Sequence, residues 1–227
     1  MANQLDLEEQ EQLDQLKHFW KQYGNLITWG LIVILGAVAS WNGYHAWQRR
    51  QAAQAGAMFD EVEKVVRGAD AQRAERAFND MKERFSNAVY TQQAGLLVAK
   101  MTYEAGKIDT AKSTLNWLVE NAADKGYASI ARLRLSALLV DAKSYDEAVK
   151  VLSTGVSDEF SALADDRRGD IYTLQGKKTE AQAEYQRAFK GLEEQSEYRR
   201  LVVVKLNSLG VDPLATAKVT ASVEVAK

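Results

Sequence analysis

The sequence contains no cysteine and a single proline among its 227 residues. Without cysteine, the chain has no disulfide framework, thiolate zinc site, iron–sulfur cluster or cysteine nucleophile. Proteins contain about 5% proline on average, and proline interrupts helices and marks β-turns. Its scarcity therefore argues against β-sandwiches, barrels and disordered linkers, and it predicts an almost entirely helical chain.

Histidine is almost as scarce, since His18 and His45 are the two in the sequence. They leave almost no room for a histidine metal site or a histidine acid–base pair. The nucleophile motif G-x-S-x-G and the zinc motif H-E-x-x-H are both absent. Carboxylates are scattered at salt-bridge spacing on predicted helix faces. We therefore expect a protein that is not an enzyme and that uses no cofactor or metal.

Positive charge is not concentrated anywhere in the chain, which carries 29 basic and 31 acidic residues. No basic stripe with interleaved aromatic residues occurs, so nucleic acid is not an expected partner. Residues 1–24 form an acidic head, in which five acidic residues outnumber two lysines. This head is either an interfacial helix or a solubilising tail.

A long uncharged stretch follows: Gln22 to Gln48 contains no Lys, Arg, Asp or Glu over 27 residues. About 20 apolar residues suffice for a helix to cross a hydrocarbon core of roughly 30 Å. Residues 25–48 are therefore predicted to be a single transmembrane helix in the lipid bilayer. Aromatic residues flank both of its ends, as expected for rings at the two membrane–water interfaces: Trp20, Tyr23, Trp29, Trp41, Tyr44 and Trp47.

A cleavable secretory signal is the competing interpretation, because residues 37–39 form an A-x-A triplet that resembles a cleavage site. The negatively charged start and the continuation of the apolar run favour an uncleaved anchor. Counting positive charges does not orient this anchor, since Lys17 and Lys21 on one side balance Arg49 and Arg50 on the other.

Small residues recur along one face of the predicted span, at positions i, i+3, i+4 and i+7: Gly36, Ala39, Ser40 and Gly43. Small side chains let helix backbones approach closely in lipid, where association depends on packing. This stripe is a candidate face for a transmembrane partner helix. The competing interpretation is that glycine is simply common in membrane helices.

Beyond Arg50 the sequence is helical and repetitive. Apolar residues recur at i, i+3, i+4 and i+7, and short turns rich in glycine or lysine interrupt them about every 34–38 residues. This period is typical of stacked helical hairpins of the tetratricopeptide type. The turns are expected at 67–70, 106–109, 142–145 and 176–179.

The last repeat carries the tetratricopeptide signature, with small residues where helices cross and large ones beside them: Gly169, Tyr172, Gly176, Ala181, Tyr185 and Ala188. Such a hairpin cannot bury its apolar face alone and has to stack on its neighbours. The predicted fold is therefore all-α, with the transmembrane helix followed by a tetratricopeptide-like right-handed helical solenoid over residues 49–212. Residues 213–227, which begin at the single proline, are predicted to be a C-terminal tail.

The first helix of each pair is expected to line the concave groove of the solenoid. Its candidate binding residues are Gln93, Leu96, Lys100, Tyr103, Ile130, Leu133, Val140, Leu163, Asp166, Asp170 and Leu174. This set lacks the fixed Lys/Asn/Arg combination that would clamp the C-terminal carboxylate of a peptide. Such a groove suits loose recognition of unfolded or partner segments through apolar contacts. The alternative is that several of these residues pack in the core between helices.

Four segments carry a family resemblance: LKHFWKQYGN before the span, WNGYHAWQRRQ after it, RGDIYTLQGKKTEAQAEYQRAF in the last repeat, and VVVKLNSLG near the end. Over nearly its whole length the chain resembles the YfgM-type ancillary subunits of the SecYEG translocon. The resemblance implies a single-pass bacterial inner-membrane protein, with its N-terminus in the cytoplasm and its repeats in the periplasm. It also implies association with the translocon and with a membrane-anchored periplasmic chaperone (PpiD-like), and it carries over no catalytic residue.

Three hypotheses of function follow. The first is a membrane-anchored adaptor that assists the handover of emerging secreted polypeptides through protein–protein contacts. The second is a structural scaffold for another envelope assembly, such as cell division or outer-membrane biogenesis. The third, an enzyme or enzyme regulator built on a repeat frame, has no constellation of residues to support it.

Overall fold

The computed structural model describes residues 7–214, in which every regular element is an α-helix. The helices are α1 (Leu7–Arg67), α2 (Ala71–Phe85), α3 (Val89–Glu104), α4 (Ile108–Asn121), α5 (Lys125–Asp141), α6 (Tyr145–Ser153), α7 (Asp158–Leu174), α8 (Lys178–Gly191) and α9 (Glu197–Ser208). The predicted all-α fold is confirmed, and helices end close to the predicted turns. Residues 1–6 of the acidic head and 215–227 of the predicted tail lie outside the described residues.

Internal contacts divide the chain into two units, the first ending at Gln51 and the second beginning at Ala52. In the first unit, part of α1 is long and apolar enough to cross a membrane, and 6% of that stretch is buried. A core helix of a soluble protein would bury most of such a stretch. Large apolar side chains, among them Ile34, Leu35 and Val38, are exposed along it. Such an exposed apolar surface fits a helix that is anchored in a membrane, where hydrocarbon would surround it.

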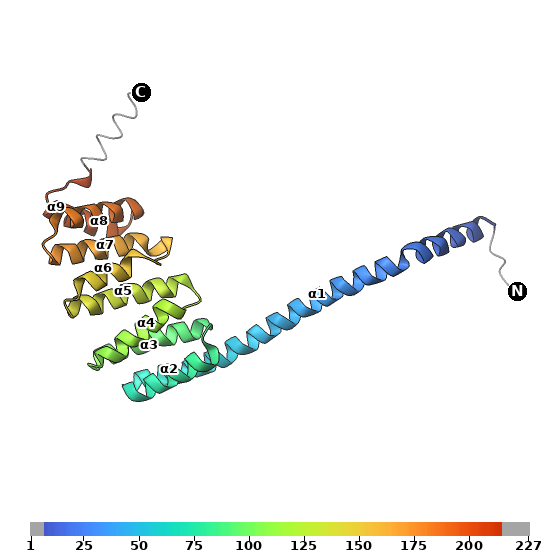
Figure 1. The fold of residues 1–227 in the computed structure, drawn as a ribbon, viewed down its shortest axis with the longest axis horizontal. Coiled ribbons are helices and arrows are strands. Elements are labelled where there is room, and N and C mark those ends of the chain that lie inside the picture. Colours follow the sequence, from blue (N-terminus) through green and yellow to red (C-terminus); the bar gives the residue numbers. More distant parts are fainter. Residues whose placement is uncertain (1–6, 215–227) are drawn as a thin grey trace, which may run out of the picture. The chain divides into compact units, whose positions relative to one another are not determined.

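The second unit is a stack of helix pairs (Figure 1). The end of α1 packs on α2, and the following pairs are α3 with α4, α5 with α6, and α7 with α8, after which α9 contacts α8. The first helices of successive pairs also contact one another, α3 with α5 and α5 with α7. These three helices therefore form a continuous layer along the stack.

Hydrophobic clusters run through the stack and join neighbouring pairs. The central cluster extends from α3 to α7 and contains the buried residues Leu135 and Leu152. Alanines at matching positions of α4, α6 and α8 are completely buried, as expected for small residues where helices cross: Ala111, Ala148 and Ala181. Of the small residues in the predicted signature, Ala181 and Ala188 are completely buried, whereas Gly176 lies in an exposed turn.

The turns that follow α3, α5 and α7 share one backbone arrangement. In each, a backbone N–H donates a hydrogen bond back to a carbonyl near the end of the preceding helix, at 2.8–2.9 Å. This helix ending requires a residue in the left-handed conformation. Gly106 and Gly176 provide it with φ of 76° and 71°, and Lys143 does so with φ of 60°. The repeated turn keeps α3, α5 and α7 in matching positions along the stack.

Candidate interaction groove

The residues predicted to line the groove differ widely in exposure. Lys100, Tyr103 and Leu174 are exposed. Leu96 and Asp166 are buried, at 8% and 1% exposure. The others are half-buried: Gln93, Ile130, Leu133, Val140, Leu163 and Asp170.

On α5, the predicted apolar positions Ile130, Leu133 and Val140 pack against the central hydrophobic cluster. Apolar side chains on a helix of a stacked pair fill the space between helices, because burial there removes them from water. The exposed positions of α5 in this layer belong instead to Arg134, Ala137 and Asp141. Sequence reasoning missed these three, although their i, i+3, i+7 spacing marks one helix face.

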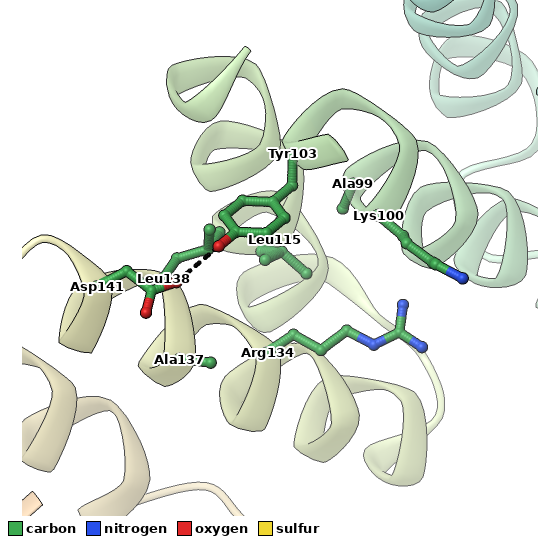
Figure 2. A pocket seen from close by; sticks show the side chains of 8 residues that line it. All are labelled: Ala99, Lys100, Tyr103, Leu115, Arg134, Ala137, Leu138 and Asp141. Atoms are coloured by element: carbon green, nitrogen blue, oxygen red, sulfur yellow. Dashed lines mark hydrogen bonds between the residues drawn. The ribbon is translucent and has the colours of Figure 1, made fainter. Parts of the chain in front are cut away.

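A cavity of about 430 Å³ lies between α3 and α5 (Figure 2). It contains two of the predicted groove residues, Lys100 and Tyr103. Its remaining lining is Ala99 from α3, Leu115 from α4, and Arg134, Ala137, Leu138 and Asp141 from α5. We refer to these eight residues as the α3–α5 pocket. A pocket of this volume falls in the range of about 300–1,000 Å³ that is typical of ligand sites.

One end of the α3–α5 pocket is closed by a hydrogen bond between the two helices. The hydroxyl of Tyr103 donates to Oδ2 of Asp141 at 2.7 Å (Figure 2). This bond and the charge of Asp141 raise the pKa of Tyr103, because the protonated phenol is the form that donates to the carboxylate. Tyr103 as a whole is 41% exposed, and its ring offers an apolar surface beside the pocket.

A second polar contact between α3 and α5 lies closer to the start of both helices. The side-chain amide of Gln93, a predicted groove residue, donates to the hydroxyl of Tyr127 at 2.7 Å. Together with the bond between Tyr103 and Asp141, it fixes the spacing of the two helices. The pocket therefore lies between two helices whose relative position is set from both ends.

The predicted groove residues Asp166 and Asp170 on α7 belong to an internal network. Nζ of Lys205, on α9, lies 2.8 Å from both carboxylate oxygens of Asp166 and 2.7 Å from Oδ1 of Asp170. The hydroxyl of Tyr198 donates to Asp166 at 2.6 Å, and that of Tyr185 donates to Asp170 at 2.8 Å. Burial and these carboxylates raise the pKa of both tyrosines. Asp166 and Asp170 therefore have a structural role: they hold α9 against α7.

A second group of charges joins α7 to α8. Arg168 pairs with Asp165 and, at 3.0 Å, with Glu184, while Arg187 also pairs with Glu184. Arg168 additionally donates to the carbonyl of Leu152 at 2.7 Å. Among the described side chains of residues 11–214, no group of three His, Cys, Asp or Glu is arranged to hold a metal ion. These charged residues have structural partners within the repeats.

In the first unit, the four small residues of the predicted partner face are exposed on α1: Gly36, Ala39, Ser40 and Gly43. A Cβ atom added at Gly36 or Gly43 would meet nothing within 4 Å. Nothing in the described chain therefore demands glycine at these two positions.

Comparison with known proteins covers almost the whole chain. Residues 17–211 match the model of the tetratricopeptide repeat-like domain family. An ancillary SecYEG translocon subunit of Neisseria gonorrhoeae is 31% identical over 207 residues, which cover 89% of this chain and 98% of the relative. Proteins of the same name are 29% identical in Haemophilus influenzae and 22% identical in Escherichia coli, with 98% and 97% of each relative covered.

The repeat architecture, the membrane-spanning length of α1 and these relatives agree. The fold has helix pairs stacked in tetratricopeptide manner, and the similarity extends over both units of the chain. The expected family is thereby confirmed. The chain belongs to the family of ancillary SecYEG translocon subunits, whose members carry a tetratricopeptide repeat-like domain.

Proposed function

We propose that this protein is an inner-membrane adaptor that works beside the SecYEG translocon. Its repeats contact a membrane-anchored periplasmic chaperone (PpiD-like) or an emerging secreted polypeptide, and they assist the handover between the two. The protein acts by binding other proteins and not by catalysing a reaction. The observation that carries it is the extended similarity to relatives named as translocon subunits, combined with an accessible pocket between repeat helices.

In this proposal, residues 25–48 anchor the chain, with the N-terminus in the cytoplasm and the repeats in the periplasm. The exposed apolar surface of α1 supports the anchor. Tethering matters because a groove confined beside the translocon exit meets its partner at an effective concentration of about millimolar. Weak apolar contacts in the groove then suffice for useful occupancy.

The orientation is tested by adding protease to spheroplasts and to inverted inner-membrane vesicles. We expect the repeats to be degraded in spheroplasts and protected in inverted vesicles. The reverse pattern would place the repeats in the cytoplasm and contradict a role in receiving secreted chains.

The partner is tested by photocrosslinking in native membranes. A photoreactive residue replacing Ala137, which is exposed in the α3–α5 pocket, reports on the groove. The same residue replacing Asn116, which is exposed on α4, is the matched control outside the pocket. We expect adducts with translocon subunits or a membrane-anchored chaperone from position 137, and much weaker ones from position 116.

Recovery of cell-division or outer-membrane assembly proteins from position 137, with no translocon subunit or chaperone, would support the scaffold hypothesis instead.

A further inference from the structure

We propose that the α3–α5 pocket binds a peptide segment in which an acidic side chain lies next to an apolar one. The carboxylate pairs with Lys100 and Arg134, and the apolar side chain lies on the pocket floor. This inference rests on the proposed function, and it names the chemistry of the segment that the groove receives.

The floor of the pocket is apolar. Ala99, Leu115 and Leu138 line it, and each of the three residues is at most 8% exposed. They come from α3, α4 and α5, so the floor is a junction of three packed helices and is formed before any partner arrives. A preformed apolar surface binds an aliphatic side chain without the cost of ordering flexible groups.

Arg134 is a cation without a carboxylate. Its Nη1 donates to the backbone carbonyl of Leu96 at 2.8 Å, and among the side chains described, those of residues 11–214, no carboxylate forms an ion pair with it. A guanidinium has five N–H donors, so most of its donors are left for a ligand. Although Arg134 is exposed, part of its side chain is shielded from water, which lowers its pKa, and no neighbouring negative charge offsets this effect. A partly desolvated cation of this kind favours a carboxylate, which accepts two parallel hydrogen bonds.

Lys100 supplies the second positive charge, and Figure 2 shows its side chain, from α3, and that of Arg134, from α5, pointing toward the same side of the pocket. Its partner is Glu104 at 3.8 Å on the same helix, and both side chains are more than 60% exposed. Such a solvent-exposed pair contributes little to stability, because water screens the two charges. A ligand carboxylate can therefore replace Glu104 easily.

The two ends of the pocket differ in charge. Asp141, bonded to Tyr103, lies two helical turns beyond Arg134 on α5, roughly 10 Å along the helix axis. Its negative charge repels a carboxylate from that end, so an acidic ligand group is directed to Lys100 and Arg134. The pocket lining holds no Asn or Gln side chain that would recognise a terminal carboxylate and its amide together. These features favour an internal Asp or Glu over a free C-terminus.

The test is peptide binding by the full chain in detergent micelles, measured by fluorescence anisotropy. The probe is a labelled peptide with both termini blocked, in which one Glu is flanked by Leu in a Gly/Ser background. Its matched partner has Gln in place of Glu. We expect the Glu peptide to bind about tenfold more tightly, as for a charge-assisted pair that replaces a neutral contact.

Lys100→Gln and Arg134→Gln are each expected to remove most of this tenfold difference. Lys150→Gln, an equal loss of charge on the exposed surface of α6, is the control and should preserve it. Because Arg134 also bonds to Leu96, its variant is checked by thermal melting. Lys100 is exposed on α3, so its variant carries the test even if Arg134→Gln unfolds.

Equal binding of the Glu and Gln peptides would overturn the proposal, as would a preference unaffected by Lys100→Gln. Binding that requires a free C-terminal carboxylate would also overturn it. The proposed function is tested separately, by crosslinking from position 137. It is contradicted if no translocon subunit or chaperone is recovered there. If crosslinks to the translocon or a chaperone are recovered but the Glu and Gln peptides bind equally, the proposed function stands and the preference for an acidic segment is wrong.

Discussion

At the scale of single residues, the side chain of Tyr185 leaves room only for glycine at position 169. A Cβ atom on Gly169 would lie 2.5 Å from Cδ1 and Cε1 of Tyr185, on the facing helix α8. Tyr185 is buried and its hydroxyl is bonded to Asp170, so the ring is held at both ends. The absence of a side chain at position 169 is therefore what lets α7 and α8 approach.

We expect Gly169→Ala to lower the free energy of unfolding by about 1–3 kcal/mol, the usual cost of overpacking a fixed core. The measurement is urea unfolding of the full chain in detergent, followed by circular dichroism. Gly68→Ala is the control, because a Cβ there meets its nearest atom, a backbone oxygen, at 3.4 Å. Equal stability of the Gly169 and Gly68 variants would contradict the packing argument.

At the scale of helices and turns, Lys143 occupies a position that glycine holds in the equivalent turns. Its φ of 60° lies in the left-handed region, as do those of Gly106 and Gly176. A residue with a Cβ pays about 1 kcal/mol or more for this conformation. The backbone of the turn after α5 is therefore strained at Lys143. The turns after α3 and α7 avoid this strain because glycine occupies the same position.

Lys143→Gly is therefore expected to stabilise the repeats by about 0.5–1 kcal/mol, since the relief of strain exceeds the added entropy of the unfolded chain. Gly176→Ala should do the opposite, by a similar amount. Both are measured as shifts of the urea midpoint. A loss of stability in Lys143→Gly would mean that the lysine side chain contributes more than its backbone strain costs.

The transmembrane element carries a separate prediction. Replacing Gly36 and Gly43 together with leucine should weaken co-purification of membrane partners, because bulky side chains keep a partner helix at a distance. The repeats should remain folded, since nothing described contacts these positions. Ile34→Leu with Val38→Leu, on the opposite face of α1, is the control. Unchanged co-purification of the glycine variant would remove this stripe as a partner face.

At the scale of the whole repeat unit, α9 closes the stack through charge as well as packing. Val202 and Leu206 are completely buried beside α8, and Lys205 reaches across to Asp166 and Asp170 on α7. A solenoid is stabilised by contacts between neighbouring pairs, so its last pair needs such a cap.

Lys205→Met should destabilise the repeats by about 3 kcal/mol, because it leaves Asp166 buried with its charge uncompensated. Lys190→Met, on the exposed surface of α8, is the control and should have little effect. Adding Asp166→Asn to the Lys205 variant should restore part of the loss. If Lys205→Met melts like the unaltered chain, the network does not hold α9.

Several features of the fold could be predicted because they depend on residues near one another in the sequence. The turn at Gly176, the small residues Ala181 and Ala188, and the uncharged stretch before Gln48 are all local patterns. The α3–α5 pocket could be predicted in part, since Lys100 and Tyr103 were identified while Arg134 and Asp141 were not. On α5, apolar side chains suggested a binding surface, but such side chains are also the ones that packing buries.

The sequence by itself determined that this protein is helical and repetitive and that it has one apolar segment long enough to span a membrane, because periodicity, turn residues and composition act over a few residues. The tertiary structure alone decided which side chains meet. Arg134 reaches the carbonyl of Leu96 across 38 positions, and Lys205 reaches Asp166 across 39. Such contacts depend on how successive helix pairs stack, so the pocket emerges only when α3, α4 and α5 have packed together, and the closing network only when α9 has packed beside α7 and α8.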